Sequence, residues 1–150
     1  MTTVPQRWDV TPRRGWAGGA LLVVLVLVAV NAVYGGVGLV VNGMGMPSEW
    51  LDRLPVDTWT WPGVALVLTV AVPQLVAAWF VWRKDPRAGV VGLVVGAALV
   101  LWIVVQLLVL ERYFFLQPVI AAFGVLEMAL SWGWIHRSRS AVRTPWAHKP

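Results

Sequence analysis

Four long apolar runs, separated by short polar stretches, make up most of this chain. The runs cover about residues 17–41, 62–82, 89–110 and 113–135. An α-helix rises ~1.5 Å per residue, so about 20 apolar residues cross a hydrocarbon core ~30 Å thick. The pattern therefore predicts an all-α membrane protein, a bundle of four transmembrane helices.

The composition agrees with a single membrane domain. The chain is 59% hydrophobic and 13% charged, whereas a soluble domain averages about 45–50% apolar and 25% charged residues. We expect a flexible basic arm over residues 1–16, the membrane domain over 17–135 and a flexible basic tail over 136–150, with no room for a separate soluble module. Because the chain has no cysteine, disulfides, thiolate metal sites and thiol catalysis are excluded.

The Arg13-Arg14 pair before the first run raises the alternative of a secretion signal. Such signals have an apolar core of about 7–15 residues followed by a small-residue cleavage site. The run over 17–41 is longer than that, and no clear cleavage site follows it. We therefore interpret this run as a spanning helix.

The distribution of basic residues predicts the orientation. The chain has 12 Lys and Arg residues: three in the arm, three in the turn over 83–87 and four in the tail, leaving Arg53 and Arg112 in the two loops opposite. Cytoplasmic loops of membrane proteins are enriched in Lys and Arg, so both termini are predicted in the cytoplasm of a multi-pass cell-membrane protein. The basic charge is thus a topology signal that favours contact with membrane lipids, and no nucleic-acid partner is predicted.

The first outer loop contains a predicted short helix. Pro47 begins it, acidic residues follow, and it stops before Pro55. Trp50, Leu51 and Leu54 share one side of this segment. Indole rings prefer the depth of the lipid headgroups, so we expect an interfacial helix, with a docking surface for a partner as the alternative.

Polar residues within the apolar runs are the candidates for function. Asn31, Gln74 and Glu127 belong to three different runs and fall within about 5 Å of the predicted midplane. A charged side chain at this depth costs ~2.5–3.5 kcal/mol, and no Lys or Arg lies there. We therefore predict an intramembrane polar cluster in which Glu127 is hydrogen-bonded to Gln74 or Asn31, and is neutral or faces water.

A second polar level is predicted toward the outer face, where the alternative is an ordinary charged corner at the interface. Its members are Gln106, Glu111, Arg112 and Gln117. Within the second run, Pro73 removes a backbone donor and predicts a kink, either structural or of the kind found in transporters.

Small residues predict close helix crossings. Gly92 and Gly96 form a small-xxx-small pattern, and Gly124 and Ser131 share a face with Glu127. Gly35 and Gly38 share a face with Asn31. We interpret this face as a helix-packing seam in which the amide is hydrogen-bonded, and a ligand contact is the alternative. The predicted helix-packing residues are Gly35, Gly38, Gly92, Gly96, Gly124 and Ser131.

Three classes of function compete. An enzyme is disfavoured, because no Ser-His-Asp arrangement, metal-spaced cluster or phosphate loop is present, and no catalytic residue or cofactor is predicted. Both histidines, His136 and His148, lie in the tail, so the runs offer no haem ligand. A transporter or channel is less favoured, because four spans leave only a narrow pore within a monomer. The sequence also has no clear inverted repeat of the kind that many transporters contain. We therefore favour an accessory or assembly component that binds a membrane-protein partner or its own copies, with a transporter, channel or proton relay through Glu127 as the alternative.

Several motifs are more specific than generic apolar sequence. They are Asn31-Ala-Val-Tyr-Gly-Gly-Val-Gly38, Gly45-Met-Pro-Ser-Glu-Trp-Leu51, Pro62-Gly-Val-Ala-Leu66, Trp102-Ile-Val-Val-Gln106 and Leu116-Gln-Pro118, together with Gly96 and Gly124. Over about residues 20–132 the chain resembles a family of small four-span bacterial integral membrane proteins of uncharacterised activity. The resemblance implies the same topology in a bacterial plasma membrane and draws attention to Gln106, Gln117 and Trp50. The chain has Pro55-Val56 where the family pattern usually has Pro-Phe.

Overall fold

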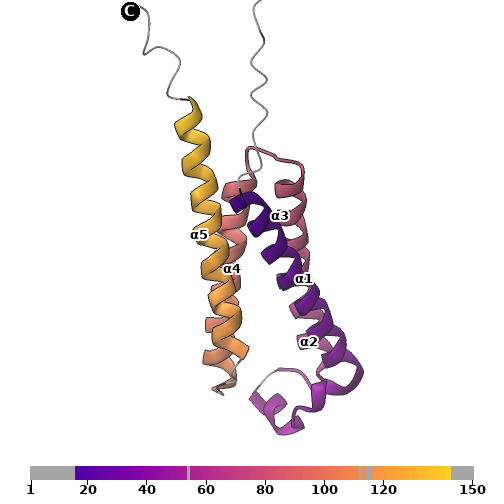
Figure 1. Ribbon diagram of the computed structural model, residues 1–150. Helices are drawn as coiled ribbons and strands as arrows, with labels where there is room; N and C mark the ends of the chain where they lie inside the picture. Colours follow the sequence, from indigo (N-terminus) through magenta and orange to yellow (C-terminus); the bar gives the residue numbers. More distant parts are fainter. Residues whose placement is uncertain (1–15, 54, 112, 114–115, 143–150) are drawn as a thin grey trace, which may run out of the picture.

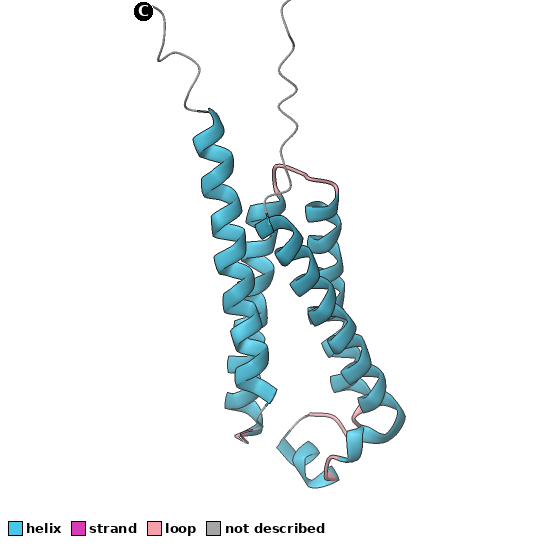
Figure 2. Cartoon of the chain, in the orientation of Figure 1, coloured by secondary structure: helices cyan, strands magenta, loops and turns pink. Residues whose placement is uncertain are grey.

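The computed structural model describes residues 16–53, 55–111, 113 and 116–142, and this part of the chain is helical without any strand. Four of its segments are long and apolar enough to cross a membrane, which confirms the predicted all-α class and indicates a multi-pass membrane protein. These segments are Trp16–Gly45, Thr60–Trp82, Ala88–Val109 and Leu116–His136. Loops and turns lie at the two ends of the bundle (Figure 2).

The first span is helix α1 (Trp16–Asn42), and glycines end it. Gly43 and Gly45 take positive φ angles of 63° and 70° in the short 3-10 helix η1 (Gly43–Gly45). Glycine adopts this left-handed conformation without steric cost. The Asn42 side chain closes the turn by accepting a 2.9 Å hydrogen bond from the Met44 N–H.

The second span consists of three consecutive helical pieces. They are α2 (Thr60–Leu66), the π-helical turn η3 (Val67–Ala71) and α3 (Val72–Trp82). Pro73 lies at the start of α3 and has no N–H to donate, and the wide turn lies directly before it. In that turn the Val72 N–H bonds to the carbonyl of Val67, five residues back. At Pro73, where the sequence predicts a kink, the regular α-helix is thus broken by one π-helical turn.

The third and fourth spans are α4 (Ala88–Leu110) and α5 (Leu116–Val142). Asp85 closes the turn before α4, since its carboxylate accepts a 2.8 Å hydrogen bond from the Arg87 N–H. α4 ends at Glu111, whose left-handed backbone lets its N–H bond to the Leu107 carbonyl at 3.0 Å. This is the usual way in which a helix satisfies its last carbonyls.

The four spans pack in a ring. α1 packs against α2 and α3, α3 against α4, α4 against α5, and α5 against α1, so that α3 and α5 lie diagonally across the bundle. The start of α1, the α3–α4 turn and the end of α5 lie at one end, here called the basic end (Figure 1). Residues 43–53 and 55–59, the end of α4 and the start of α5 lie at the other, here called the loop end. The α1–α2 pair diverges from α4 and α5 toward the loop end (Figure 1).

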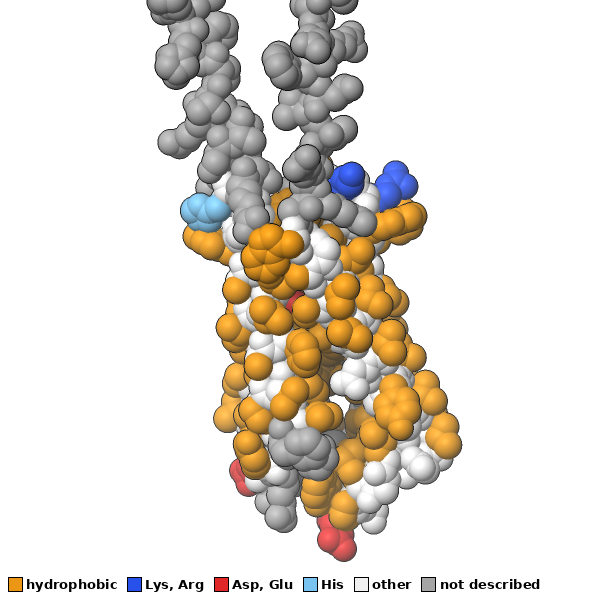
Figure 3. Space-filling model, viewed as in Figure 1, with side chains coloured by type: hydrophobic (Ala, Val, Ile, Leu, Met, Phe, Trp, Pro, Cys, Tyr) orange, Lys and Arg blue, Asp and Glu red, His pale blue; other side chains and the backbone are white. Residues whose placement is uncertain are grey.

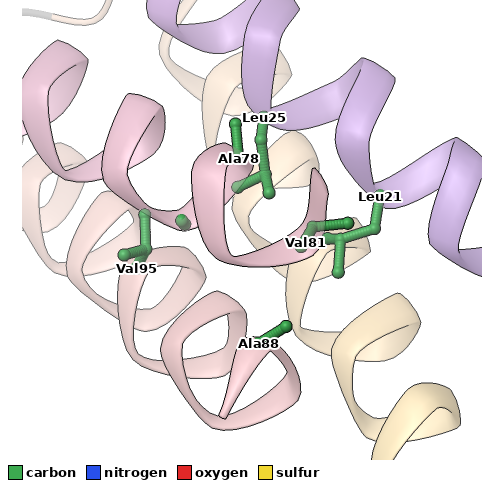
Figure 4. Packing of buried hydrophobic residues seen from close by; sticks show 7 residues of the cluster. Leu21, Leu25, Ala78, Val81, Ala88 and Val95 are labelled. Carbon is green, nitrogen blue, oxygen red and sulfur yellow. The ribbon is translucent and has the colours of Figure 1, made fainter. Parts of the chain in front are cut away.

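Small and branched side chains fill the bundle toward the basic end. Leu21 and Leu25 of α1 are fully buried against the alanines of α3 and the start of α4 (Figure 4). Lipid is as apolar as leucine, so close packing and not water exclusion stabilises such contacts. The residues of this cluster are Leu21, Leu25, Ala77, Ala78, Val81, Ala88 and Val95.

Apolar side chains also cover the outside of the bundle, as expected for a surface in contact with lipid. Leu27, Leu68, Leu101 and Leu108 are among the exposed ones. Figure 3 shows hydrophobic side chains over the length of the molecule, Lys and Arg near the basic end, Asp and Glu at the loop end, and a small acidic spot partway along the bundle.

Two predicted boundaries need correction. Residues 136–142 were predicted as part of a flexible tail, but they continue α5. The stretch has no Gly or Pro before Pro145, and Arg and Ala are good helix formers. His136 also stacks on Trp132, with ring centroids 4.8 Å apart. The short helix predicted over residues 47–54 is present as the 3-10 helix η2 (Ser48–Arg53).

Candidate functional site

A hydrogen bond crosses the centre of the bundle. Gln74 of α3 donates from Nε2 to Oε2 of Glu127 on α5, at 3.0 Å, and both side chains are fully buried. Because α3 and α5 lie diagonally opposite, the two long side chains span the interior between them. The predicted bond between Glu127 and Gln74 is thus present.

Glycines of α4 make room for this pair. A Cβ atom on Gly96 would lie 2.7 Å from the Gly124 carbonyl oxygen and 3.0 Å from the Cβ of Glu127. A Cβ on Gly92 would collide with the hydroxyl of Ser131. The small residues of α4 therefore face the polar side of α5, and a larger residue at either position would push α5 outward.

Ser131 adds a third polar group at the same depth range. It follows Glu127 by four positions on α5, so the two side chains share a face, and it is also fully buried. Three oxygens of this group, Gln74 Oε1, Glu127 Oε1 and Ser131 Oγ, have no hydrogen-bond partner among the described residues. We call Gln74, Glu127 and Ser131 the central site.

Apolar residues enclose the central site toward both ends. On α3, Val70 and Ala71 lie one turn before Gln74, and Ala77 and Ala78 lie one turn after it; all are buried. A cavity of about 10 Å³ lies beside Gln74, which is close to the smallest space that holds one water molecule. Its lining residues are Thr69, Val70, Pro73, Gln74, Val95, Ala98 and Leu99.

Asn31 is not part of the central site, contrary to the prediction. Its side chain is exposed on the outer face of α1, while Val28 and Ala32 point into the bundle. Asn31 forms no hydrogen bond with any residue that the structure describes. The estimate of depth did not indicate which side of its helix each residue occupies.

The predicted outer polar residues lie near the α4–α5 turn. Gln117 is buried at the start of α5, Gln106 is half-buried near the end of α4, and Glu111 is exposed in the turn. Arg112 lies outside the described residues. The indole nitrogen of Trp102 is buried nearby on α4 without a partner among the described residues, and the sequence analysis did not select it.

The closest crossing of the first two spans uses glycines that the sequence analysis missed. A Cβ on Gly63 would lie 2.6 Å from the carbonyl oxygen of Gly36, and one on Gly36 would lie 2.8 Å from that of Gly63. The selected Gly35 and Gly38 are half-buried beside this contact. A built Cβ on Gly35 reaches only Leu66, and one on Gly38 reaches Met44.

The short helix η2 contacts α4. Leu51 is buried and Trp50 is half-buried, while Leu54 lies outside the described residues. One side of η2 therefore packs on the protein itself.

No group of three His, Cys, Asp or Glu residues in the described part of the chain is arranged to hold a metal ion. No family model, curated protein or solved structure matches the chain. The likeness to small four-span bacterial proteins therefore stays a prediction.

Proposed function

We propose that this protein is an assembly component of a cell membrane that forms a homodimer through the outer face of α1. One observation carries the proposal: Asn31 presents an unpaired amide on the outside of the bundle, near the middle of a membrane span. Lipid tails offer no hydrogen bonds, and amide side chains between membrane helices provide them. An outward amide at this depth therefore favours a second helix as its neighbour.

The residues around Asn31 form a seam along α1. Leu27, Asn31, Tyr34, Gly38 and Val41 follow one another at alternating steps of four and three residues, and Met44 lies against Gly38 within it. Leu27, Tyr34 and Val41 are 55%, 71% and 74% exposed. This spacing keeps residues on one side of a pair of supercoiled helices, and a single Asn within such a seam specifies its register.

A second copy of the chain is the partner that fits this seam. The amide of Asn31 both donates and accepts, so it is complementary to itself. A two-fold axis brings the same residue of both copies together. Two copies inserted in the same orientation place Asn31 at the same depth, so that their amides meet without a shift of the helices.

The orientation that we propose has both termini in the cytoplasm and η2 at the outer interface. It is supported by Arg83, Lys84 and Arg87 in the α3–α4 turn at the basic end, because Lys and Arg are enriched in cytoplasmic loops. Transport through the bundle has less support, because buried apolar residues enclose the central site toward both ends.

The test is the mass of the full-length protein in lipid nanodiscs, with dimer dissociation measured by dilution into lipid. Asn31→Leu is expected to weaken the dimer about 3- to 30-fold, from the ~0.6–2 kcal/mol of polar bonds between membrane helices. Thr69→Val is the matched control: Thr69 is also an exposed polar residue of a span, but its hydroxyl already bonds to the Ala65 carbonyl at 2.7 Å.

Cross-linking locates the interface. Since the chain has no cysteine, a single Leu27→Cys substitution is expected to give a disulfide-linked dimer, and Val90→Cys on exposed α4 is not. A wild-type monomer that carries only lipid, a stoichiometric complex with a different protein, or equal dimer affinity of Asn31→Leu and wild type would each refute the homodimer.

A further inference from the structure

We propose that the central site binds one proton, held between Oε1 of Glu127 and Oε1 of Gln74, and that this proton locks α3 to α5. The proposal does not depend on dimerisation. It starts from the two oxygens that the bond between Gln74 and Glu127 leaves unpaired: one on the carboxyl group and one on the amide, both fully buried.

A carboxylic acid and a primary amide have complementary edges. The amide N–H donates to one carboxyl oxygen, and the acid O–H donates to the amide oxygen. The first of these bonds is present at 3.0 Å. A proton on Glu127 Oε1 supplies the donor for the second, and it satisfies both unpaired oxygens at once. Buried polar groups of folded proteins are nearly always paired in this way.

The surroundings of Glu127 favour the neutral acid over a carboxylate. From α4, a Cβ on Gly96 would lie 3.0 Å from the Cβ of Glu127, and a Cβ on Gly92 would lie between Ser131 and the apolar side chain of Leu21 on α1. α3 contributes the amide of Gln74, which donates to Glu127, and α5 itself contributes the buried hydroxyl of Ser131 one turn along, and neither of these side chains is titratable. The other charged residues that the structure describes lie at the bundle ends, as in the turn over 83–87. A buried charge without a counter-charge is costly in lipid.

A proton fits this site better than a metal ion does. Hard cations bind six or more oxygens, whereas the described central site offers three unpaired ones. The cavity of about 10 Å³ beside Gln74 has space for at most one water molecule. A proton requires only two oxygens, and the existing hydrogen bond leaves one unpaired oxygen on each of its two side chains.

The bound proton has a structural consequence. α3 and α5 are diagonal in the ring, and the described side chains of Gln74 and Glu127 form the hydrogen bond between them. Loss of the proton removes one of two bonds and leaves a charge in the bundle, which weakens the link between the two helices. The central site is thus a proton-dependent lock across the bundle.

Infrared spectroscopy of the full-length protein in lipid nanodiscs tests the proposal. At pH 7, where exposed carboxyl groups are ionised, the wild type is expected to show the carbonyl band of a protonated carboxylic acid. The band should shift in heavy water and disappear in Glu127→Gln. Glu111→Gln, which changes an exposed acid, should retain it. Absence of the band from the wild type at pH 7 would refute the proton site.

Stability provides a second test. An amide at position 127 pairs with Gln74 without a titratable proton, so Glu127→Gln should fold with a stability that does not change between pH 6 and 9. The wild type should lose stability as the pH rises through this range, since the folded protein holds a proton that the unfolded chain releases. A parallel pH dependence in both proteins would contradict the proposal.

Chemical labelling of the wild type needs no variant. Dicyclohexylcarbodiimide is apolar and reacts with protonated carboxyl groups, so mass spectrometry should find it on Glu127. Sodium chloride, compared with choline chloride at equal concentration, should leave the labelling rate unchanged. Protection by sodium would assign the site to a metal cation and overturn the proton assignment.

Discussion

The side-chain amide of Gln74 and the carboxyl group of Glu127, 53 positions apart in the chain, are joined by a buried 3.0 Å hydrogen bond. The bond links diagonal helices of the ring, α3 and α5, and glycines of α4 leave the space that the two side chains occupy.

Gln74→Leu should destabilise the protein by about 1–3 kcal/mol, because it leaves the buried carboxyl group of Glu127 without its donor. Unfolding of the protein in lipid bicelles measures the change. The double variant Gln74→Leu with Glu127→Leu should recover part of the loss, since it removes both polar partners. If the two single losses simply add in the double variant, the two side chains are not coupled.

Gly96→Ala should destabilise the bundle by about 1–3 kcal/mol, because the new methyl group meets the Gly124 carbonyl and forces α4 and α5 apart. Gly133→Ala on α5 is the matched control, as its added Cβ would have no neighbour within 4 Å. The control should change the free energy of unfolding by less than about 0.5 kcal/mol or raise it slightly. Equal effects of the two substitutions would argue against the close crossing.

Gly36→Ala should be more harmful than Gly35→Ala, although the two glycines are adjacent. A methyl group at position 36 meets the Gly63 carbonyl at 2.8 Å, which is rigid backbone, while one at 35 meets only the end of the Leu66 side chain at 3.3 Å. We expect a difference of at least 1 kcal/mol on the scale of overpacked cores (~1–3 kcal/mol). Thermal unfolding of the two variants in the same lipid decides which glycine faces the second span.

The proposed orientation predicts which residues are accessible from outside the cell. In a chain without cysteine, a Ser48→Cys variant should react with a membrane-impermeant maleimide on intact cells. A Lys84→Cys variant in the α3–α4 turn should react only after the membrane is permeabilised. The reverse pattern would place both termini outside.

Local sequence was sufficient for the helices and the number of spans. A spanning segment is recognised from about 20 consecutive apolar residues, and this requires no knowledge of what packs against it. The helix breaks at Gly43 and Pro73 also follow from local sequence. Gly43 adopts a positive φ angle that favours glycine, and Pro73 has no backbone N–H to donate.

The sequence by itself thus determined the four apolar helices, their approximate ends and which polar residues lie within the spans. Only the tertiary structure decided which way each helix faces. In a water-soluble helix the polar side marks the exterior, but here lipid and protein interior are equally apolar, so the pattern does not separate the two faces. For this reason Asn31 was placed inside although it lies outside, and Gly35 was selected where its neighbour Gly36 makes the crossing. The pairing of Gln74 with Glu127 depended on tertiary packing, because α4 contacts both α3 and α5 and so holds these two helices within reach of each other's side chains.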